Sequence, residues 1–488
     1  MLIKVKKYWI FVLLAFILGL GLFLRVYNIG NLLGFYYDQG RDALTVWNLW
    51  HKGDLFLIGP TTGIAGIFRA PYYYYLIAPF YLLGGGNPVW PSVFLSLTTI
   101  AASFLAYLLG AKIHSKTAGI IAAFISAISF NLVMASRWLS NPTPMLVLSI
   151  LLVWFMLKVT EGKKWSWVGI AVIAGLSLFS FGSAGEVFYF LTIAVFAVWQ
   201  KKNLPDKKIF IVSCLAFLLT IVPLIIFDFK NNFLMAGNIK KFLIDDKSFR
   251  EVIWAVVQEK VGFYWDVFTK LIFHGRWEKE KFLLGTAFFF VVFYLNRLIK
   301  LQGVKILLLL LSFAMLGLIF FQGNEGNFYD YYLTGYFLPF ILLFSIGLAE
   351  VTITWWGKVF VFYFLYMFTV NNYYPLRFKL TDNVDRPGSI ALKTELSAVN
   401  WVYEDAKEKE FNVDIYVPPV IPYAYDYLFL WRGNGKRVEE NRTLLYTLYE
   451  NVPSDNLSAW LERQKGIGKI EEEVQFGGVV VQRRTRYE

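Results

Sequence analysis

The chain has 488 residues, of which 57% are hydrophobic and only 17% are charged, and this balance excludes a soluble globular protein. The formal net charge of +12 does not indicate a nucleic-acid partner, because the basic residues form short clusters between apolar runs. Cys214 is the only cysteine, which excludes a disulfide framework and a cysteine-based metal site. The composition therefore predicts a multi-pass membrane protein.

The first apolar run, residues 8–24, follows three lysines near the N-terminus. Such a pattern is typical of a signal peptide, but no cleavage site of small residues follows the run, which ends at Arg25-Val26-Tyr27. We therefore expect a retained first transmembrane helix whose N-terminus lies in the cytoplasm.

Residues 25–90 form a predicted outer loop that is too apolar to be fully solvated. Within it, Val46, Trp47 and Trp50 recur at helical spacing, which predicts a short amphipathic helix in the membrane interface. The run 71–84 is short for a membrane span, and we interpret it as a second interfacial or re-entrant helix. If this run were a full span, most of the lysine clusters further along would be exported, contrary to the positive-inside rule.

Ten further apolar segments bring the expected number of membrane-spanning helices to eleven. The lysine clusters between them then fall on the cytoplasmic side, where only Glu161, Asp206 and Glu350 oppose them. The expected segments are roughly 91–111, 117–135, 143–157, 166–181, 187–200, 209–227, 282–296, 306–321, 333–349 and 358–371.

The composition changes at about residue 376 to that of a soluble α/β domain. We expect a helix that starts near Pro387 and Gly388 and continues to Ala406. Further expected elements are strands at 413–417, 444–449 and 474–482, and a helix at 455–463. The chain therefore divides into a transmembrane domain, residues 1–375, and an extracytoplasmic α/β domain, residues 376–488.

A polar stretch, residues 35–43, directly follows the first helix and contains Asp38, Arg41 and Asp42. If a helix starts near Tyr37, the spacing of four places both carboxylates on one face; Asp42 is otherwise the cap of a helix that begins at residue 43. Cations on the outer face oppose the positive-inside bias, so they indicate an anionic partner. The cations predicted at this depth are Arg41, Arg69, Arg137 and Lys230.

A carboxylate that faces several cations suits the transfer of a group from a donor whose leaving group is a phosphate. The carboxylate takes the proton of an acceptor hydroxyl, and arginine or lysine offsets the charge on the departing phosphate. Because soluble nucleotide sugars belong to the cytoplasm, a donor used on the outer face should be carried by a membrane lipid. A polyprenyl phosphate fits this requirement.

Four segments carry a resemblance to the membrane glycosyltransferases of the C-type superfold (GT-C), such as the protein O-mannosyltransferases and the lipid A aminoarabinose transferases. Residues 38–42 resemble their Asp-Glu motif, and residues 69–73 are similar to their His-Pro-Pro-Leu-Tyr-Tyr segment. Residues 136–142 resemble their outer Ser-Arg turn, and residues 330–339 their Arg-Tyr-Leu-Leu-Pro segment.

This resemblance implies a mainly α, polytopic protein of the cell membrane that catalyses an inverting transfer from a polyprenyl-phosphate sugar. Asp38 is then the catalytic base, with Asp42 as its partner, and the two carboxylates are also candidates for holding a divalent cation. Gln39 stands where the family usually has Glu, and Arg69 replaces His. The later segment lacks its arginine, so phosphate recognition falls to Arg41, Arg69, Arg137 and Lys230.

Several outer residues are candidates for binding the sugar or the acceptor. Glu186 and Asp228 each end a predicted span, and Asp330 and Tyr331 lie in a tyrosine-rich loop, although interfacial tyrosine belts give the same pattern. The resemblance leaves open the identity of the sugar and the class of the acceptor, which is a lipid, a glycan or a protein. Two alternatives stay open: a transporter or flippase, which needs ionisable residues at mid-bilayer, and a polymerase or ligase of lipid-linked glycans.

Overall fold

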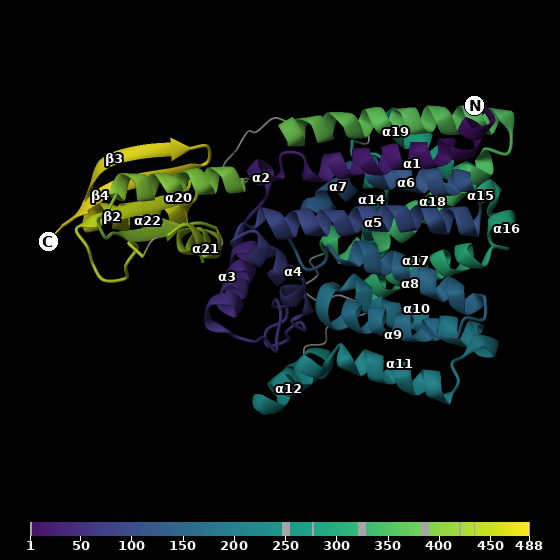
Figure 1. Ribbon diagram of the computed structural model, residues 1–488, viewed down its shortest axis with the longest axis horizontal. Helices are drawn as coiled ribbons and strands as arrows, with labels where there is room; N and C mark the ends of the chain where they lie inside the picture. The colour runs from purple at the N-terminus through teal and green to yellow at the C-terminus, as the bar shows by residue number, and fades with distance from the viewer. Residues whose placement is uncertain are drawn as a thin grey trace.

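Long helices pack side by side in one bundle, and a small α/β domain lies beyond one end of the bundle (Figure 1). The N-terminus lies at the opposite end of the bundle from this domain (Figure 1). The computed structural model describes residues 2–245, 254–275, 278–320, 328–381, 390–418, 421–433 and 435–487.

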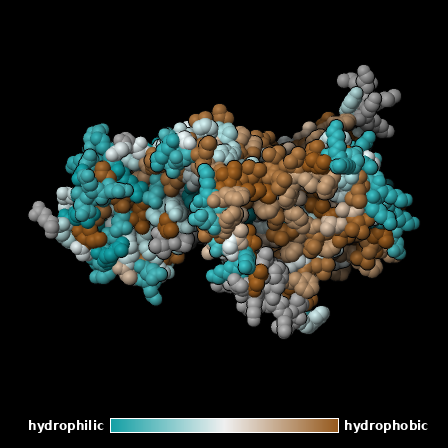
Figure 2. Space-filling view, turned by 90° about the horizontal axis from the view of Figure 1, so that it is seen from below, coloured by the Kyte–Doolittle hydropathy of each residue, from teal (hydrophilic) through white to brown (hydrophobic). Residues whose placement is uncertain are grey.

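Four helical segments of the described chain are long and apolar enough to cross a membrane. They are residues 8–26 of α1 (Leu2–Val26), α5 (Val89–Ile113), α17 (Gln302–Phe320), and η6 (Asp330–Leu333) with α18 (Thr334–Val351). Figure 2 shows the hydrophobic surface of the bundle between hydrophilic surfaces at its two ends. The chain is therefore a multi-pass membrane protein, and the expected number of eleven spans stays a prediction.

Two of the expected single spans are helix pairs with a sharp bend. α6 (Lys116–Ile128) and α7 (Phe130–Arg137) meet at 62°, and α11 (Lys207–Leu219) and α12 (Val222–Lys230) meet at 53°. Ser129 leaves the helical conformation at the first bend, and its hydroxyl caps α7. A proline in the first turn of α12 marks the second bend, because proline cannot donate the backbone hydrogen bond that would continue α11.

The other helices of the bundle are shorter or lie at its edges. α19 (Trp355–Thr381) runs past the expected domain boundary at residue 375, and it includes Pro375. The described domain therefore begins with α20 (Leu392–Ala406), and the expected helix start at Pro387 and Gly388 lies outside the described residues. The remaining elements are α2 (Ile29–Leu32), α8 (Met145–Thr160), α9 (Ser166–Leu176), η1 (Ser177–Phe181), η2 (Gly185–Phe188), α10 (Tyr189–Trp199), η3 (Lys201–Asn203), α13 (Leu234–Lys240), η4 (Lys241–Asp245), α14 (Trp254–Lys270), α15 (Glu278–Phe293) and α16 (Leu295–Leu298).

A buried arginine ties α1 to its neighbours near the end of the bundle that faces the α/β domain. The Arg25 side chain is fully buried, and its Nε donates to Thr99 Oγ1 on α5 at 3.1 Å. Its two Nη groups donate to the carbonyl oxygens of Gly21, Ser126 and Ala127 at 2.7–3.0 Å. These bonds satisfy a charge that lipid would not accommodate.

The loop between the first two long helices contains the two expected short helices, α3 (Tyr37–Lys52) and α4 (Tyr72–Leu83). Both lie at the end of the bundle next to the α/β domain (Figure 1). α3 starts before the amphipathic run that predicted it, so the polar stretch 38–42 forms its first turns.

The α/β domain contains a four-stranded sheet with the strand order β1-β2-β4-β3. β1 (Asn412–Tyr416) pairs parallel with β2 (Leu444–Glu450), and β4 (Val479–Arg486) pairs antiparallel with both β2 and β3 (Gly468–Phe476). α20, α21 (Tyr423–Arg432) and α22 (Asp455–Ile467) complete the domain. The single strand expected at 474–482 was wrong, because Gly477, with φ 53°, turns this segment into a hairpin.

Candidate active site

The start of α3 fixes the positions of the two candidate carboxylates. The backbone N–H of Tyr36 donates to Gln39 Oε1 at 3.1 Å, and Gln39 Nε2 donates to the carbonyl of Leu139 at 3.1 Å. Because α3 begins at Tyr37, Asp38 lies in its first turn and Asp42 lies one turn further on. Asp42 is therefore not a helix cap, and the two carboxylates share one face of α3.

Arg41 connects the two carboxylates. Its Nη1 lies 2.9 Å from Asp38 Oδ1, and its Nη2 and Nε donate to Asp42 Oδ1 at 2.8 and 3.0 Å. Nη1 also donates to Thr61 Oγ1 at 3.2 Å, and the Tyr74 hydroxyl of α4 donates to Asp42 Oδ1 at 3.1 Å. One guanidinium thus orients both acids and joins α3 to the loop before α4.

The two carboxylates differ in exposure. The side chain of Asp38 is 59% exposed, whereas that of Asp42 is 7% exposed. Burial raises the pKa of Asp42 to about 6, against the opposing effect of Arg41. Asp38 is the carboxylate that a substrate can reach, and Asp42 supports Arg41 from behind.

A cavity of about 450 Å³ lies between α7, α14 and the start of α18, and neither Asp38 nor Asp42 is among its lining residues. Tyr331 joins the two features: its side chain lines the cavity, and its hydroxyl lies within electrostatic reach of Asp38. Trp138, another lining residue, packs edge-on against Tyr331 with ring centroids 5.6 Å apart. Asp330 also lines this cavity, so the structure brings Asp330 and Tyr331 together in one wall, and Tyr331 is the residue of the two that is linked electrostatically to Asp38.

Arg69 lies near Glu186 and near Tyr331 of the cavity wall. Its guanidinium is within electrostatic reach of Glu186, Tyr331 and Tyr332, and its Nη1 donates to the carbonyl of Gly182. Burial lowers the pKa of Arg69, while Glu186 acts in the opposite direction. Its buried Nε has no hydrogen-bond partner among the described residues, which leaves a donor for an anionic ligand.

Arg137 both stabilises the end of α1 and lines a cavity. Its Nη1 donates to the carbonyl oxygens of Leu24, Arg25 and Tyr27 at 2.9–3.2 Å, so it stabilises the end of α1. Its Nη2 is buried and finds no partner in the part of the chain that the structure describes. Arg137 lines a smaller cavity of about 180 Å³, which shares Trp138 with the larger one.

Two other predicted site residues, Glu186 and Asp228, accept local backbone hydrogen bonds, and a third, Lys230, lies away from both cavities. Both carboxylate oxygens of Glu186 accept backbone N–H bonds, from Ser183 at 2.6 Å and from Gly335 at 2.7 Å. Asp228 accepts the backbone N–H of Met235 at 2.7 Å, at the start of α13. Lys230 is exposed at the end of α12, and neither it nor Asp228 lines either of these two cavities.

The carboxylate pair is a poor donor set for a metal ion. The Arg41 guanidinium already pairs with both acids and offsets part of their charge. Among the residues that the structure describes, no group of three or more His, Cys, Asp or Glu side chains is placed to hold a metal. We therefore derive no step through a divalent cation.

Sequence reasoning missed several residues of the site. Lys270 lines the larger cavity, and its Nζ lies 2.5 Å from Asp266 Oδ2. Lys379, at the end of α19, lines the smaller cavity with Arg137. Lys270 lies between the expected spans 209–227 and 282–296, in a segment predicted on the outer side, so the sequence predicts its side of the membrane. Only the fold shows that Lys270 and Asp330 line the same cavity.

The helical bundle and the appended α/β domain define the GT-C fold. The structure of ArnT from Cupriavidus metallidurans bound to undecaprenyl phosphate superposes with a TM-score of 0.62 and 10% identity, and the match covers 97% of this chain and 98% of that one. The apo structure of the same protein gives a TM-score of 0.63 with 10% identity and covers 98% of each chain. The predicted fold class is thereby confirmed.

A second solved structure and a family match point to the same class of fold. An Archaeoglobus fulgidus oligosaccharyltransferase in complex with Zn and sulfate gives a TM-score of 0.52 at 13% identity, covering 90% of this chain and 68% of that one. Residues 69–227 match the family described as dolichyl-phosphate-mannose-protein mannosyltransferase. No curated protein sequence matches the chain.

Proposed function

We propose that this protein is an inverting membrane glycosyltransferase that takes a sugar from a polyprenyl-phosphate donor. The observation that carries the proposal is Asp38, exposed in the first turn of α3, paired with Arg41 and within electrostatic reach of Tyr331, which lines a cavity together with Lys270. The GT-C fold supports it, and a protein with this fold is bound to undecaprenyl phosphate in its solved structure.

In this mechanism Asp38 accepts the proton of the acceptor hydroxyl as the acceptor oxygen bonds to the anomeric carbon. The bond between that carbon and the phosphate oxygen breaks on the opposite face of the sugar, so the configuration inverts. The donor leaves as polyprenyl phosphate, and its growing negative charge is offset by Arg69, Arg137 and Lys270. Trp138 and Tyr331 offer aromatic faces to the sugar.

The proposed site faces the extracytoplasmic side of the cell membrane. Support comes from the opposite positions of the N-terminus and the α/β domain in Figure 1, since the N-terminal lysines favour the cytoplasm. At the N-terminal end of the bundle, Lys112 and Lys158 both pair with Glu161, at 2.6 and 3.4 Å. These basic clusters are the ones that the positive-inside rule assigns to the cytoplasm.

The flippase alternative requires ionisable groups that a substrate can meet within the bundle. Arg25 is a buried charge of this kind, but it lies at the end of α1 and makes four hydrogen bonds to protein groups. Its bonding is that of a structural residue, which favours the transferase.

The decisive test replaces Asp38. In membranes supplied with undecaprenyl-phosphate hexose or undecaprenyl-phosphate aminopentose, Asp38→Asn should lower the release of undecaprenyl phosphate by about 10²–10⁴-fold, because the base is lost. Asp38→Glu should restore part of the turnover. Asp54→Asn, an exposed aspartate just beyond the other end of α3, is the matched control and should keep full activity. Full turnover by Asp38→Asn would remove Asp38 from the role of base.

A further inference from the structure

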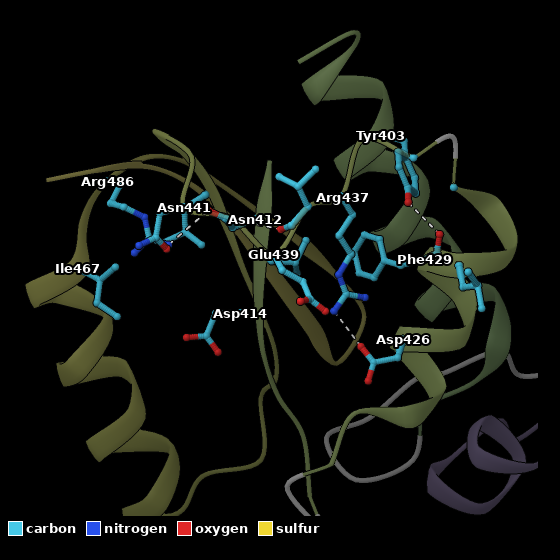
Figure 3. A pocket seen from close by; sticks show the side chains of 16 residues that line it. Tyr403, Asn412, Asp414, Asp426, Phe429, Arg437, Glu439, Asn441, Ile467 and Arg486 are labelled. Atoms are coloured by element: carbon cyan, nitrogen blue, oxygen red, sulfur yellow. Dashed lines mark hydrogen bonds and ion pairs between the residues drawn. The ribbon is translucent and has the colours of Figure 1, made fainter. Parts of the chain in front are cut away.

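The α/β domain contains a cavity of about 840 Å³ that the reaction described above does not use. Its walls come from β1, α21, residues 435–441 and the ends of α22 and β4 (Figure 3). The volume is within the range of about 300–1,000 Å³ that is typical of small-molecule sites. It lies in the domain beyond the end of the bundle, whereas the cavity lined by Lys270 and Tyr331 lies among the helices.

The lining carries charges of both signs in nearly equal number. Asp426 and Arg437 form an ion pair at 2.8 Å across one side, and Figure 3 shows both side chains directed toward the cavity. On the other side, Arg486 Nη2 lies 3.5 Å from Asn412 Oδ1. Asp414 and Glu439 add two carboxylates. This balance disfavours a polyanion such as a polyphosphate or a nucleic acid, which requires an excess of cations.

The same lining suits a molecule with many hydroxyl groups. Carboxylate, amide and guanidinium groups present planar arrays of acceptors and donors, and a hydroxyl both donates and accepts. Glu439 and Asn441 are exposed at the rim, where they can exchange water for a ligand. Leu430, which is 44% exposed, supplies an apolar surface in the same wall, and the C–H face of a sugar ring can pack on such a surface.

α21 links this cavity to the candidate active site. Asp426, Phe429 and Leu430 of α21 line the cavity, while Tyr423 of the same helix packs against Tyr37 of α3 with ring centroids 4.9 Å apart. The Trp431 indole, at the end of α21, donates to the carbonyl of Gly85 at 2.7 Å. A ligand in the cavity is therefore held by a helix that packs directly on the helix of Asp38.

We propose that this cavity binds a neutral, hydroxyl-rich carbohydrate segment and that this segment belongs to the acceptor. The assignment of this segment to the acceptor rests on the proposed transferase function. Carbohydrate binding by the cavity is independent of that function. The cavity would hold a part of the chain away from the reacting hydroxyl, so that binding energy from a remote part of the acceptor contributes to its orientation.

The binding test uses the full chain in detergent with Asp38→Asn, so that no turnover is required. The probes are maltohexaose, cellohexaose, mannohexaose and chitohexaose, with hexagalacturonate as the charged comparison, each titrated calorimetrically into the millimolar range. At least one neutral probe should bind, and Glu439→Ala combined with Asn441→Ala should weaken it about tenfold or more. Glu404→Ala, an exposed acid on α20 outside the cavity lining, is the matched control and should bind as the parent does.

Three results would overturn the proposal: no binding of any neutral probe, equal binding by the double variant, or tighter binding of hexagalacturonate than of every neutral probe. These outcomes are separate from the failure of the transferase function. If Asp38→Asn retained turnover while a neutral probe still bound in a manner that depends on Glu439, the transferase mechanism would be wrong and the carbohydrate site would stand.

Discussion

At the level of single residues, Arg41 connects the two carboxylates of the candidate active site. It pairs with both Asp38 and Asp42, and only the second of these acids is buried. Removing one partner of a buried ion pair leaves an uncompensated charge, which is more costly than the pair itself is favourable. Arg41 is therefore expected to matter for stability as well as for activity.

The first prediction concerns Arg41→Ala. The change should lower the free energy of unfolding by about 3–5 kcal/mol, because Asp42 loses its buried partner. Arg41→Lys should recover only part of this loss, since lysine cannot span the two carboxylates as a planar fork. Thermal unfolding in detergent measures the effect, with the exposed Arg463→Ala as the control. Equal midpoints for Arg41→Ala and Arg463→Ala would contradict this account.

The second prediction uses the pH dependence of Asp42. Its pKa is raised by burial from the ordinary value of 3.8 to about 6. Such a group contributes stability that is fully present below 3.8 and is lost as the pH rises through about 6. Asp42→Asn lacks this titration, so the midpoint of the variant relative to the parent should rise between about pH 4 and about pH 7.

Unfolding midpoints measured across that pH range provide the check. Asp54→Asn, which alters an exposed aspartate, should give a difference from the parent that does not vary with pH. A flat difference for Asp42→Asn would mean that the buried carboxylate does not titrate in this range.

The site residues could be predicted where residues with the required chemistry are neighbours in the sequence. Asp38, Arg41 and Asp42 lie within five positions of each other, so one local motif and one helix bring them together. Glu186 and Asp228 also lie at helix ends, as expected, but only the fold shows that their oxygens accept backbone N–H groups. A boundary acid that binds a ligand and one that caps a helix have the same sequence pattern.

At the level of elements, the contact between α3 and α21 depends on Gly40. A Cβ atom at this position would lie 2.2 Å from the backbone nitrogen of Ala424 and 2.4 Å from the carbonyl carbon of Tyr423. Only glycine allows the two helices to approach so closely. The interface between α3 and α21 also includes the packed rings of Tyr37 and Tyr423.

The third prediction is that Gly40→Ala separates α3 from α21. We expect a loss of about 1–3 kcal/mol in the free energy of unfolding, as for other overpacked contacts, together with reduced transfer activity. Gly285→Ala on α15 is the control, because a Cβ there would meet nothing within 4 Å. Thermal unfolding in detergent should give a lower midpoint for Gly40→Ala than for Gly285→Ala; equal midpoints would show that the two helices tolerate the extra methyl group.

The boundaries of elements were harder to predict than their existence. The bend at Ser129 interrupts an apolar run that hydropathy alone treats as continuous. Likewise, the alternation of residues 474–482 runs through Gly477. The partner strand β3 begins at Gly468 and includes the acidic segment 471–473, where no hydrophobic alternation marks it. Edge strands of this kind are stabilised by their pairing with a neighbour rather than by burial.

At the level of the whole molecule, the arrangement of charges predicts which end of the bundle faces the cytoplasm. Lys112, Lys158 and Glu161 form a cluster at one end, where His114 and Glu350 also pair at 2.8 Å. α3 and the α/β domain lie at the other end (Figure 1). This sidedness follows from sequence by the positive-inside rule, whereas the packing of the helices against one another required the three-dimensional structure.

The fourth prediction tests this sidedness with engineered cysteines. In a Cys214→Ser background, a membrane-impermeant thiol reagent should label Glu404→Cys in intact cells, because α20 is expected outside. Lys163→Cys, in the loop between α8 and α9, should react only after the cells are permeabilised. Labelling in the reverse pattern would place the proposed active site in the cytoplasm and would contradict a donor carried on the outer face.

The bonding of Arg25 also constrains the biogenesis of the protein. Its partners on α5 and α6 are at positions 99, 126 and 127, so none of them has been synthesised when α1 emerges from the ribosome. An arginine at the centre of a helix costs about 2.5–3.5 kcal/mol to insert through the translocon, and less towards the helix end. We therefore expect α1 to stay at the lateral gate until α5 and α6 have been translated, and to enter the lipid together with them.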